Sequence, residues 1–211
     1  MRFRLPFRRE ERAQPVQRTT VLSPRINDII IQLRVQSEKL RRTYQRLLAR
    51  DRELFEACVA AEQELDRDRA TIYANEIAQL RKMSRTILKS QISLEKVILR
   101  LETIKDFGDV MNALAPATRI VRQIQTELSG IVPEVAHNLS VIDEMLESVL
   151  VEAGSFTGST TTVSIADREA RKILEEAAEI AAQRMSKQFP ELPEVESETR
   201  VDSGSQQSDI R

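Results

Sequence analysis

The chain has 211 residues, of which 31% are charged and only 4% aromatic, with five glycines, no tryptophan and one cysteine. This composition favours an elongated helical protein over a compact mixed sheet, and a single cysteine excludes an internal disulfide. No run approaches the roughly 20 apolar residues that span a bilayer, and no apolar stretch follows the first arginines as in a secretory signal, so we expect a cytoplasmic protein or one bound to a membrane surface.

The net charge of −1 hides a strong asymmetry between the two halves. Residues 1–113 carry 23 basic and 16 acidic side chains, a balance of +7, whereas residues 114–211 carry 9 basic and 17 acidic side chains, a balance of −8. This split suggests an anionic partner for the front half, a separate partner for the tail, or attraction between the two halves.

Residues 1–22 contain two prolines and many arginines, which predicts an arm outside any core. Its first stretch alternates apolar side chains with arginines: Arg2, Phe3, Arg4, Leu5, Phe7, Arg8 and Arg9. Aromatic and aliphatic groups flanked by guanidinium groups suit an anionic lipid surface. The alternatives are a solvated arm or one that binds nucleic-acid phosphates. Lipid is favoured and nucleic acid is unlikely on this pattern, because phosphate binding does not need three large apolar groups.

A long helix is predicted over about residues 24–65. Ser23 supplies a helix cap and Pro24 suits the first helical position. Steps of four and three then give a stripe in which ten of twelve positions are apolar or aromatic: Ile26, Ile30, Leu33, Ser37, Leu40, Tyr44, Leu47, Asp51, Leu54, Cys58, Ala61 and Leu65. The helix would be about 60 Å long at 1.5 Å per residue.

A second long helix is predicted over about residues 68–113, after a reversal of direction at the polar segment 66–69. Its stripe has a polar gap at Ser90 and Gln91 and consists of Tyr73, Ile77, Leu80, Met83, Ile87, Leu94, Ile98, Leu101, Ile104, Phe107 and Met111. Two helices of similar length with matching stripes most simply bury them against each other as an antiparallel hairpin. Gly108 is predicted to mark a hinge.

Shorter helices are predicted over about residues 116–128, 133–151 and 166–188, which makes the fold all-α. Pro116 either starts the first of these or kinks the preceding helix. Residues 152–165 are rich in Gly, Ser and Thr and read as a linker, and Ser164 with Asp167 resembles a capping box for the last helix. Both termini are predicted to be disordered.

The residues give little support to an enzyme. His137 is the only histidine and lacks neighbours at metal-ligand spacing, Cys58 falls on the apolar stripe, and the five glycines are too scattered for a phosphate-binding loop. We therefore expect no catalytic residue, no metal site and no cofactor.

The segment FPELPEVESE at positions 189–198 interrupts an acidic tail with two prolines. Pro190 and Pro193 would keep the backbone extended, so that Leu192 and Val195 can fill adjacent pockets on a partner. The alternative is a spacer that ends the preceding helix at Gln188.

The order of these parts resembles the ESCRT-III family of membrane-scission proteins, and most closely its archaeal CdvB-type cell-division members. The resemblance covers about residues 24–151 and is carried by DRATIYANEIAQLRKM (68–83), SLEKVILRLETI (93–104) and the region 113–151, with the tail adding to it. It implies a membrane-binding arm (1–22), an ESCRT-III-like core (23–151), a linker (152–165) and a regulatory tail (166–211). It also implies a paralogue without the C-terminal winged helix of some archaeal members.

The resemblance further implies partners. Family tails bind the MIT domain of an AAA ATPase that disassembles the polymer, and Pro190, Leu192, Pro193 and Val195 match the proline-containing type of motif. Glu196 departs from it, since a further proline is usual there. The protein would polymerise with itself and with paralogues on the inner face of the cell membrane, at the division site.

The same resemblance implies a role for the opposite charges of the two halves. In the family, acidic C-terminal helices fold back on the basic hairpin and hold a closed monomer, whose opening releases filaments with a cationic side toward the membrane. Truncation at about residue 113 would then favour filaments. The alternatives are a non-enzymatic coiled-coil scaffold that dimerises through the same stripes and a nucleic-acid-binding protein that uses the arginine-rich arm.

Overall fold

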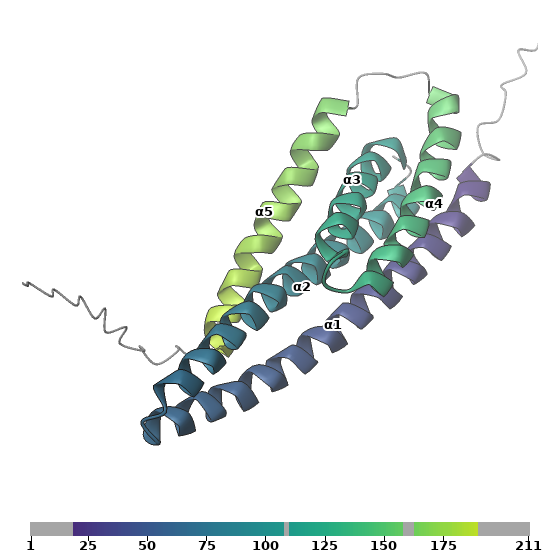
Figure 1. Cartoon of the computed structure of the whole chain (residues 1–211). Coiled ribbons are helices and arrows are strands. Elements are labelled where there is room, and N and C mark those ends of the chain that lie inside the picture. Colours follow the sequence, from purple (N-terminus) through teal and green to yellow (C-terminus); the bar gives the residue numbers. More distant parts are fainter. Residues whose placement is uncertain (1–18, 108–109, 158–162, 190–211) are drawn as a thin grey trace, which may run out of the picture.

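The computed structural model describes residues 19–107, 110–157 and 163–189, and all of its elements in these ranges are helices (Figure 1). They are α1 (Thr19–Gln63), α2 (Arg67–Phe107), α3 (Val110–Leu128), α4 (Pro133–Thr157) and α5 (Val163–Gln188). The all-α prediction is confirmed, as is the pairing of two long antiparallel helices.

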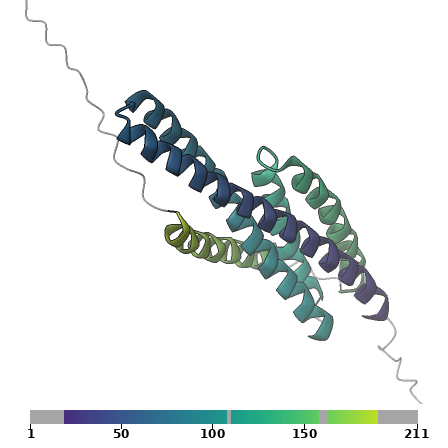
Figure 2. The same ribbon diagram turned by 90° about the horizontal axis from the view of Figure 1, so that it is seen from below.

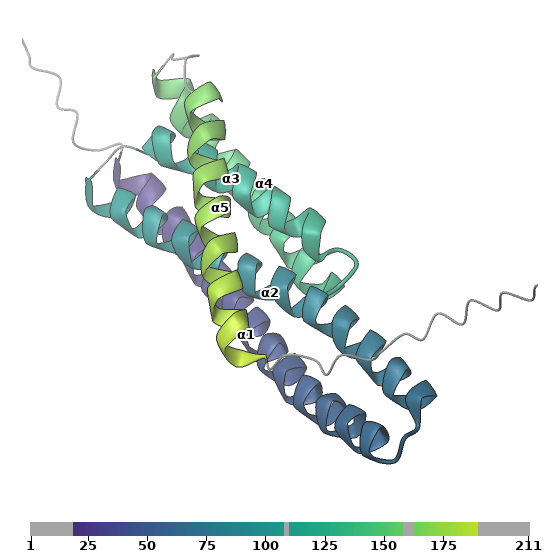
Figure 3. The same ribbon diagram turned by 90° about the vertical axis from the view of Figure 1, so that its left-hand side faces the viewer.

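The arrangement is a long hairpin with three shorter helices packed on part of its length. α3 and α4 form a second hairpin, in which α3 contacts α2 and α4 contacts α1. α5 packs against α2 and α3, and it crosses the long hairpin so that its C-terminal end lies over the middle of that hairpin (Figure 3). The closed tip of the long hairpin projects beyond α3 and α4 (Figure 2).

The apolar stripes form the seam between α1 and α2. Ile30 is 6% exposed, Leu33, Ile87 and Leu101 are fully buried, and Leu47 packs against the core while partly exposed. The polar gap at Ser90 and Gln91 is buried as well, because α2 is covered by α1, α3 and α5. At these two positions, the apolar stripe of α2 therefore predicts less burial than the structure shows.

Two stripe positions do not join the core. Leu65 is 84% exposed because it lies in the turn after α1, and Met83 is 38% exposed on α2. The side chains of Ile104, Phe107 and Met111 lie outside the part that the structure describes. Toward the tip the seam continues as a separate small cluster, formed by Leu54, Cys58, Ala61, Ala70, Ile77 and Leu80.

The turn at the tip is made without glycine. The amide of Asp66 donates to the carbonyl of Ala61 at 2.9 Å and that of Leu65 to Glu62 at 3.0 Å, the pairing of a Schellman motif. This motif places Leu65 at φ 60°, a left-handed conformation that usually favours glycine. The Asp66 carboxylate then accepts from the amide of Arg69 at 3.1 Å and caps α2. The reversal therefore centres on residues 64–66, at the start of the predicted segment.

Replacing Leu65 with glycine should stabilise the hairpin by about 1 kcal/mol, because glycine adopts this conformation without the Cβ clash. The exposed leucine side chain loses almost no burial in this change. Urea unfolding followed by circular dichroism measures the effect. Leu65→Ala is the matched control, since it removes the same side chain and keeps the unfavourable φ. An equal gain in both variants would show that the leucine, and not the backbone, is responsible.

Several boundaries differ from the predicted ones. α1 begins at Thr19 with Pro24 inside it, so Ser23 is not its cap, and α3 begins at Val110, so Pro116 does not start a helix. A proline interior to a helix loses one backbone hydrogen bond, and the buried face of α3 outweighs that loss. α4 continues to Thr157, because burial of Val149 and Ala153 extends its packed face into the predicted linker. The hinge proposed at Gly108 lies outside the described residues.

Candidate functional site

The residues predicted to touch lipid and the ATPase lie outside the described part of the chain. The arm positions from Arg2 to Arg9 fall in 1–18, and the tail positions Pro190, Leu192, Pro193 and Val195 fall in 190–211. Their roles stay predictions. The described residues instead display the surface where the acidic C-terminal helices meet the hairpin, and we treat this surface as the candidate site.

α5 docks through a face rich in alanine. Its buried face consists of Ala166, Ala170, Leu174, Ala177, Ala181 and Met185, each at most 7% exposed. The α3–α4 pair is different, because Ile120, Ile124, Leu128, Leu139 and Ile142 on it are fully buried. A buried methyl contributes about 0.8 kcal/mol and a buried leucine or isoleucine about 1.5–3 kcal/mol. The docked position of α5 is therefore held by less apolar burial than that of α3 and α4.

Ion pairs run across the same surface from cations on the long hairpin and on α3 to anions on α4 and α5. On α5 and its neighbours the pairs are Lys96 with Glu176, Arg100 with Glu169, and Arg119 with Asp167. On α4 they are Arg25 with Glu152 at 2.5 Å and Lys39 with Glu134 at 2.6 Å. Partly exposed pairs of this kind contribute about 0–1 kcal/mol each, so their number and common sign matter more than any one of them.

These contacts shift the titration of two carboxylates. The hydrogen bond from Lys96 holds the pKa of Glu176 below its usual value, and that from Lys39 does the same to Glu134. A carboxyl with a lowered folded-state pKa stabilises the folded state above its ordinary pKa, and this stabilisation is lost as the pH falls through the folded pKa. The contacts of Lys96 with Glu176 and of Lys39 with Glu134 are thus favoured at neutral pH and weakened by acid.

The α3–α4 pair is held by a separate charged cluster. Arg122 on α3 donates to the Asp143 carboxylate at 2.9 and 3.0 Å and also pairs with Glu147, both on α4. Burial raises the pKa of Asp143 although Arg122 opposes that shift. Together with the aliphatic packing described above, this cluster holds α3 against α4.

The C-terminal end of α5 has the most specific contacts of the surface. The Phe189 ring is 9% exposed and meets the Tyr44 ring edge-on, with centroids 6.4 Å apart and planes at 72°. The Tyr44 hydroxyl donates to the side-chain oxygen of Gln188. The Arg81 guanidinium lies 5.3 Å from the centre of the Phe189 ring, on which it forms a cation–π contact.

Asp51 holds that guanidinium in place. Its carboxylate accepts from Arg81 Nε at 2.7 Å and from a terminal nitrogen at 3.1 Å, and its side chain is 1% exposed. The one sign of this pair visible in the sequence is Asp51, a charged residue within a mostly apolar stripe. We call Tyr44, Asp51 and Arg81 the acceptor site.

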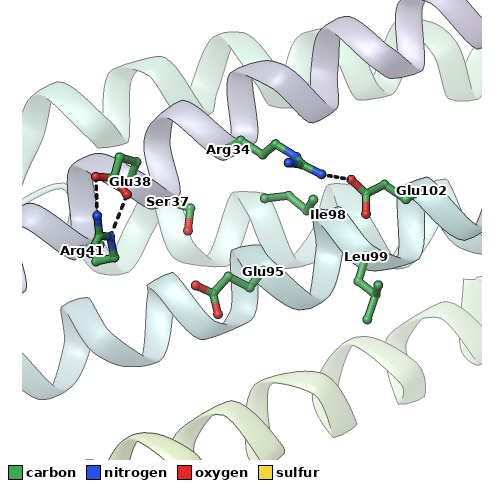
Figure 4. Close-up of a pocket in the computed structure, with 8 residues that line it drawn as sticks. All are labelled: Arg34, Ser37, Glu38, Arg41, Glu95, Ile98, Leu99 and Glu102. Atoms are coloured by element: carbon green, nitrogen blue, oxygen red, sulfur yellow. Dashed lines mark hydrogen bonds and ion pairs between the residues drawn. The ribbon is translucent and has the colours of Figure 1, made fainter.

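The open side of the hairpin holds a groove of about 440 Å³ between α1 and α2 (Figure 4). Its lining consists of Arg34, Ser37, Glu38, Arg41, Glu95, Ile98, Leu99 and Glu102. Most of the charged groups are paired: Arg34 pairs with Glu102, and hydrogen bonds from Arg41 and Arg42 lower the pKa of Glu38 to about 2. Glu95 accepts a hydrogen bond from the side-chain amide of Gln91 at 3.0 Å. Because these charged side chains pair with one another at the surface, they form a solvated structural network.

The two candidates for chemistry behave as ordinary structural residues. Cys58 is fully buried, its thiol donates to the carbonyl of Ala70 at 3.6 Å, and burial raises its pKa, which disfavours the reactive thiolate. His137 is exposed on α4. Within the described ranges no three metal-ligating side chains come together. None of the helices in those ranges has the length and apolarity required to cross a bilayer.

Comparison with known proteins gives a consistent set of relatives. The model of the Snf7 family matches residues 28–197. The chain is 41% identical over 148 residues to Cell division protein B1 of Sulfolobus acidocaldarius, covering 70% of this chain and 69% of that protein. It is 36% identical over 182 residues to Cell division protein B of the same organism, covering 86% of this chain and 70% of that protein. No solved structure matches the chain significantly.

Proposed function

The chain belongs to the Snf7 family, which is the ESCRT-III family, and from this premise we propose that it polymerises on membranes to constrict and sever membrane necks during cell division. The observation that carries the proposal is the family match across residues 28–197, which includes nearly all of the described helices. The names of the two relatives favour cell division over other membrane processes. The role is structural, on the cytoplasmic face of the cell membrane, in copolymers with paralogues.

The contacts of the C-terminal helices with the hairpin support a closed resting state. The anionic C-terminal helices α4 and α5 form several ion pairs with the cationic hairpin, and α5 packs on it through an alanine-rich face. Release of α5 would break the ion pairs that Lys96, Arg100 and Arg119 make with it and would uncover the faces of α2 and α3 beneath α5. Those surfaces are then available to a neighbouring copy and to a membrane.

The exposed side of α1 supports a membrane-facing filament. Arg42, Arg46 and Arg50 are four residues apart, so they lie along one stripe of the helix, and all three are exposed. Arg42 pairs with Glu38 and Arg50 with Glu53, which lowers but does not cancel the positive charge of the stripe. In a filament, such stripes repeat and present many cations to anionic lipid.

Burial of the stripes inside one chain argues against the scaffold alternative. A coiled-coil dimer would need the seam residues of α1 and α2 for its partner, but Leu33, Leu40, Leu94 and Leu101 are already fully buried against other helices of the same chain. Binding to nucleic acid and binding to lipid are distinguished by comparing cosedimentation with DNA and with anionic liposomes.

Replacing Phe3, Leu5 and Phe7 together with alanine, with every arginine kept, should abolish most binding to anionic liposomes. Insertion of these side chains contributes apolar burial of about 25 cal/mol per Å² beyond the attraction of the charges. Cosedimentation across a salt series measures the loss. The matched control changes Phe3 and Phe7 to leucine and keeps Leu5, which retains large apolar side chains and should keep binding. Unchanged liposome binding in the alanine variant, or stronger binding to DNA than to liposomes in the parent, would contradict insertion.

The tail is the proposed site for the disassembling ATPase. Pro190 and Pro193 restrict an extended segment, and Leu192 and Val195 supply two apolar anchors for an MIT domain. The acidic residues around them add charge but no further anchor, so we expect a modest affinity. Leu192→Ala should remove binding of an isolated MIT domain while leaving polymerisation intact.

A further inference from the structure

Large apolar side chains are exposed on the outer face of α1 and on the adjoining edge of α4. Ile31 and Val35 on α1 are 59% and 48% exposed, and Val141 on α4 is 43% exposed. α5 does not cover them, since it packs against α2 and α3. We call Ile31, Val35 and Val141 the aliphatic patch.

The contacts between α1 and α4 place Val141 beside the two patch residues of α1. Asn138 donates to the side-chain oxygen of Gln36 at 3.3 Å, and farther along α4 the Ser148 hydroxyl accepts from Arg25 at 3.0 Å. α4 therefore runs antiparallel to α1 along its N-terminal half (Figure 1). Val141 is three residues after Asn138 and seven before Ser148, so it lies on the same edge of α4. Along α1, this position falls between the two patch residues.

The same face of α1 carries cations beyond the aliphatic patch. Arg42 and Arg46 follow Val35 by seven and eleven residues, and these steps return to one face of an α-helix. Both arginines are exposed. Their positive charge favours an anionic occupant for this face. Anionic lipid fits best, because its headgroups bind guanidinium groups and its acyl boundary accepts aliphatic side chains.

We propose that the aliphatic patch is a second lipid-binding site, at which its three side chains enter the acyl boundary of an anionic membrane while Arg42 and Arg46 bind lipid phosphates. The inference rests on the proposed membrane function. It assigns lipid contact to the body of the hairpin in addition to the arm, and it makes the α1–α4 side the one that faces the bilayer. Contact through this side does not require release of α5, because the patch is exposed while α5 is docked.

The chain contains no tryptophan, so a single tryptophan introduced into the patch reports on its surroundings. The full chain with Val35→Trp is mixed with vesicles of phosphatidylglycerol and phosphatidylcholine, in which part of the phosphatidylcholine carries bromine on its acyl chains. We expect the emission to shift to the blue and to be quenched by the brominated lipid. Ile72→Trp is the matched control, because Ile72 is 57% exposed near the acidic turn at residues 64–66, and it should show neither change.

A second variant measures how much the patch contributes to binding. Replacing Ile31, Val35 and Val141 together with serine should lower the affinity for the same vesicles several-fold, although every cation and the whole arm are kept. All three side chains are exposed, so the helices should be retained, which circular dichroism checks. The matched control replaces three exposed apolar side chains elsewhere with serine and should bind as the parent does. These are Leu65, Ile72 and Leu99.

The outcomes separate this site from the proposed function. If Val35→Trp keeps its emission in buffer while the chain cosediments with vesicles, the inference fails and the membrane function stands. Unchanged affinity in the triple serine variant would also overturn the site. A blue shift of Val35→Trp that follows protein concentration without vesicles would make the patch a contact between copies of the chain instead. A complete lack of cosedimentation would remove the proposed function and the inference together.

Discussion

Deletion of residues 158–211 should make the protein assemble into filaments under conditions in which the full chain does not. The remaining chain keeps α1–α4 and loses α5, whose alanine-rich face and ion pairs with Lys96, Arg100 and Arg119 hold the closed state. Its net charge rises from −1 to +3, since residues 1–157 carry 25 basic and 22 acidic side chains. Both changes favour assembly on an anionic surface. Light scattering and negative-stain microscopy, with and without anionic vesicles, measure the outcome.

The matched control deletes only residues 190–211 and keeps Phe189. Because α5 and its contacts are then complete, this chain should stay monomeric. A truncated 1–157 chain that remains monomeric at micromolar concentration with anionic vesicles present would contradict the closed-state account. Cutting at about residue 113, as the sequence suggested, is a poorer test, because α3 and α4 bury Ile120, Ile124 and Leu139 in the main core, and their removal would expose that core.

The hairpin could be predicted from the sequence because its pattern is local. A seam that repeats every three or four residues over two long segments, without an interrupting glycine, determines both helices and their pairing. The same argument failed at Leu65, which continues the spacing but lies beyond the last turn of α1. It also failed at Pro116, where a residue that usually begins or bends a helix lies inside α3. Burial by distant segments outweighed the local preference there.

From the sequence, the docking of α5 on the hairpin could be predicted only from the opposite net charges of the two halves. The +7 and −8 halves predicted attraction, but the partners of each charge, such as Arg100 and Glu169, are set by the path of the chain between them. The contact of Phe189 with Tyr44 joins residues 145 positions apart, and no periodicity relates them. Asp51 could be recognised from the sequence as a charged residue at a seam position. Its ion-pair partner, Arg81, could not be identified in this way.

Reversing the charge of Lys96, which pairs with Glu176, tests whether ion pairs hold α5 on the hairpin. Lys96→Glu places two carboxylates opposite each other on α2 and α5, where a cation now holds the pKa of Glu176 below its usual value. Repulsion should release α5 and raise assembly on anionic vesicles several-fold, although the variant has lost positive charge. Simple attraction to lipid predicts the opposite sign. Lys82→Glu, an equal charge change at an exposed position of α2, is the control and should only weaken binding.

Assembly of the exchanged pair, Lys96→Glu with Glu176→Lys, tests the closed state most directly, because it restores the contact and leaves the total charge of the parent unchanged. Sedimentation with anionic vesicles should find high assembly in either single variant and parental assembly in the double variant. If the double variant pelleted as fully as the single ones, or if neither single variant exceeded the parent, α5 would not be the element that keeps the chain closed.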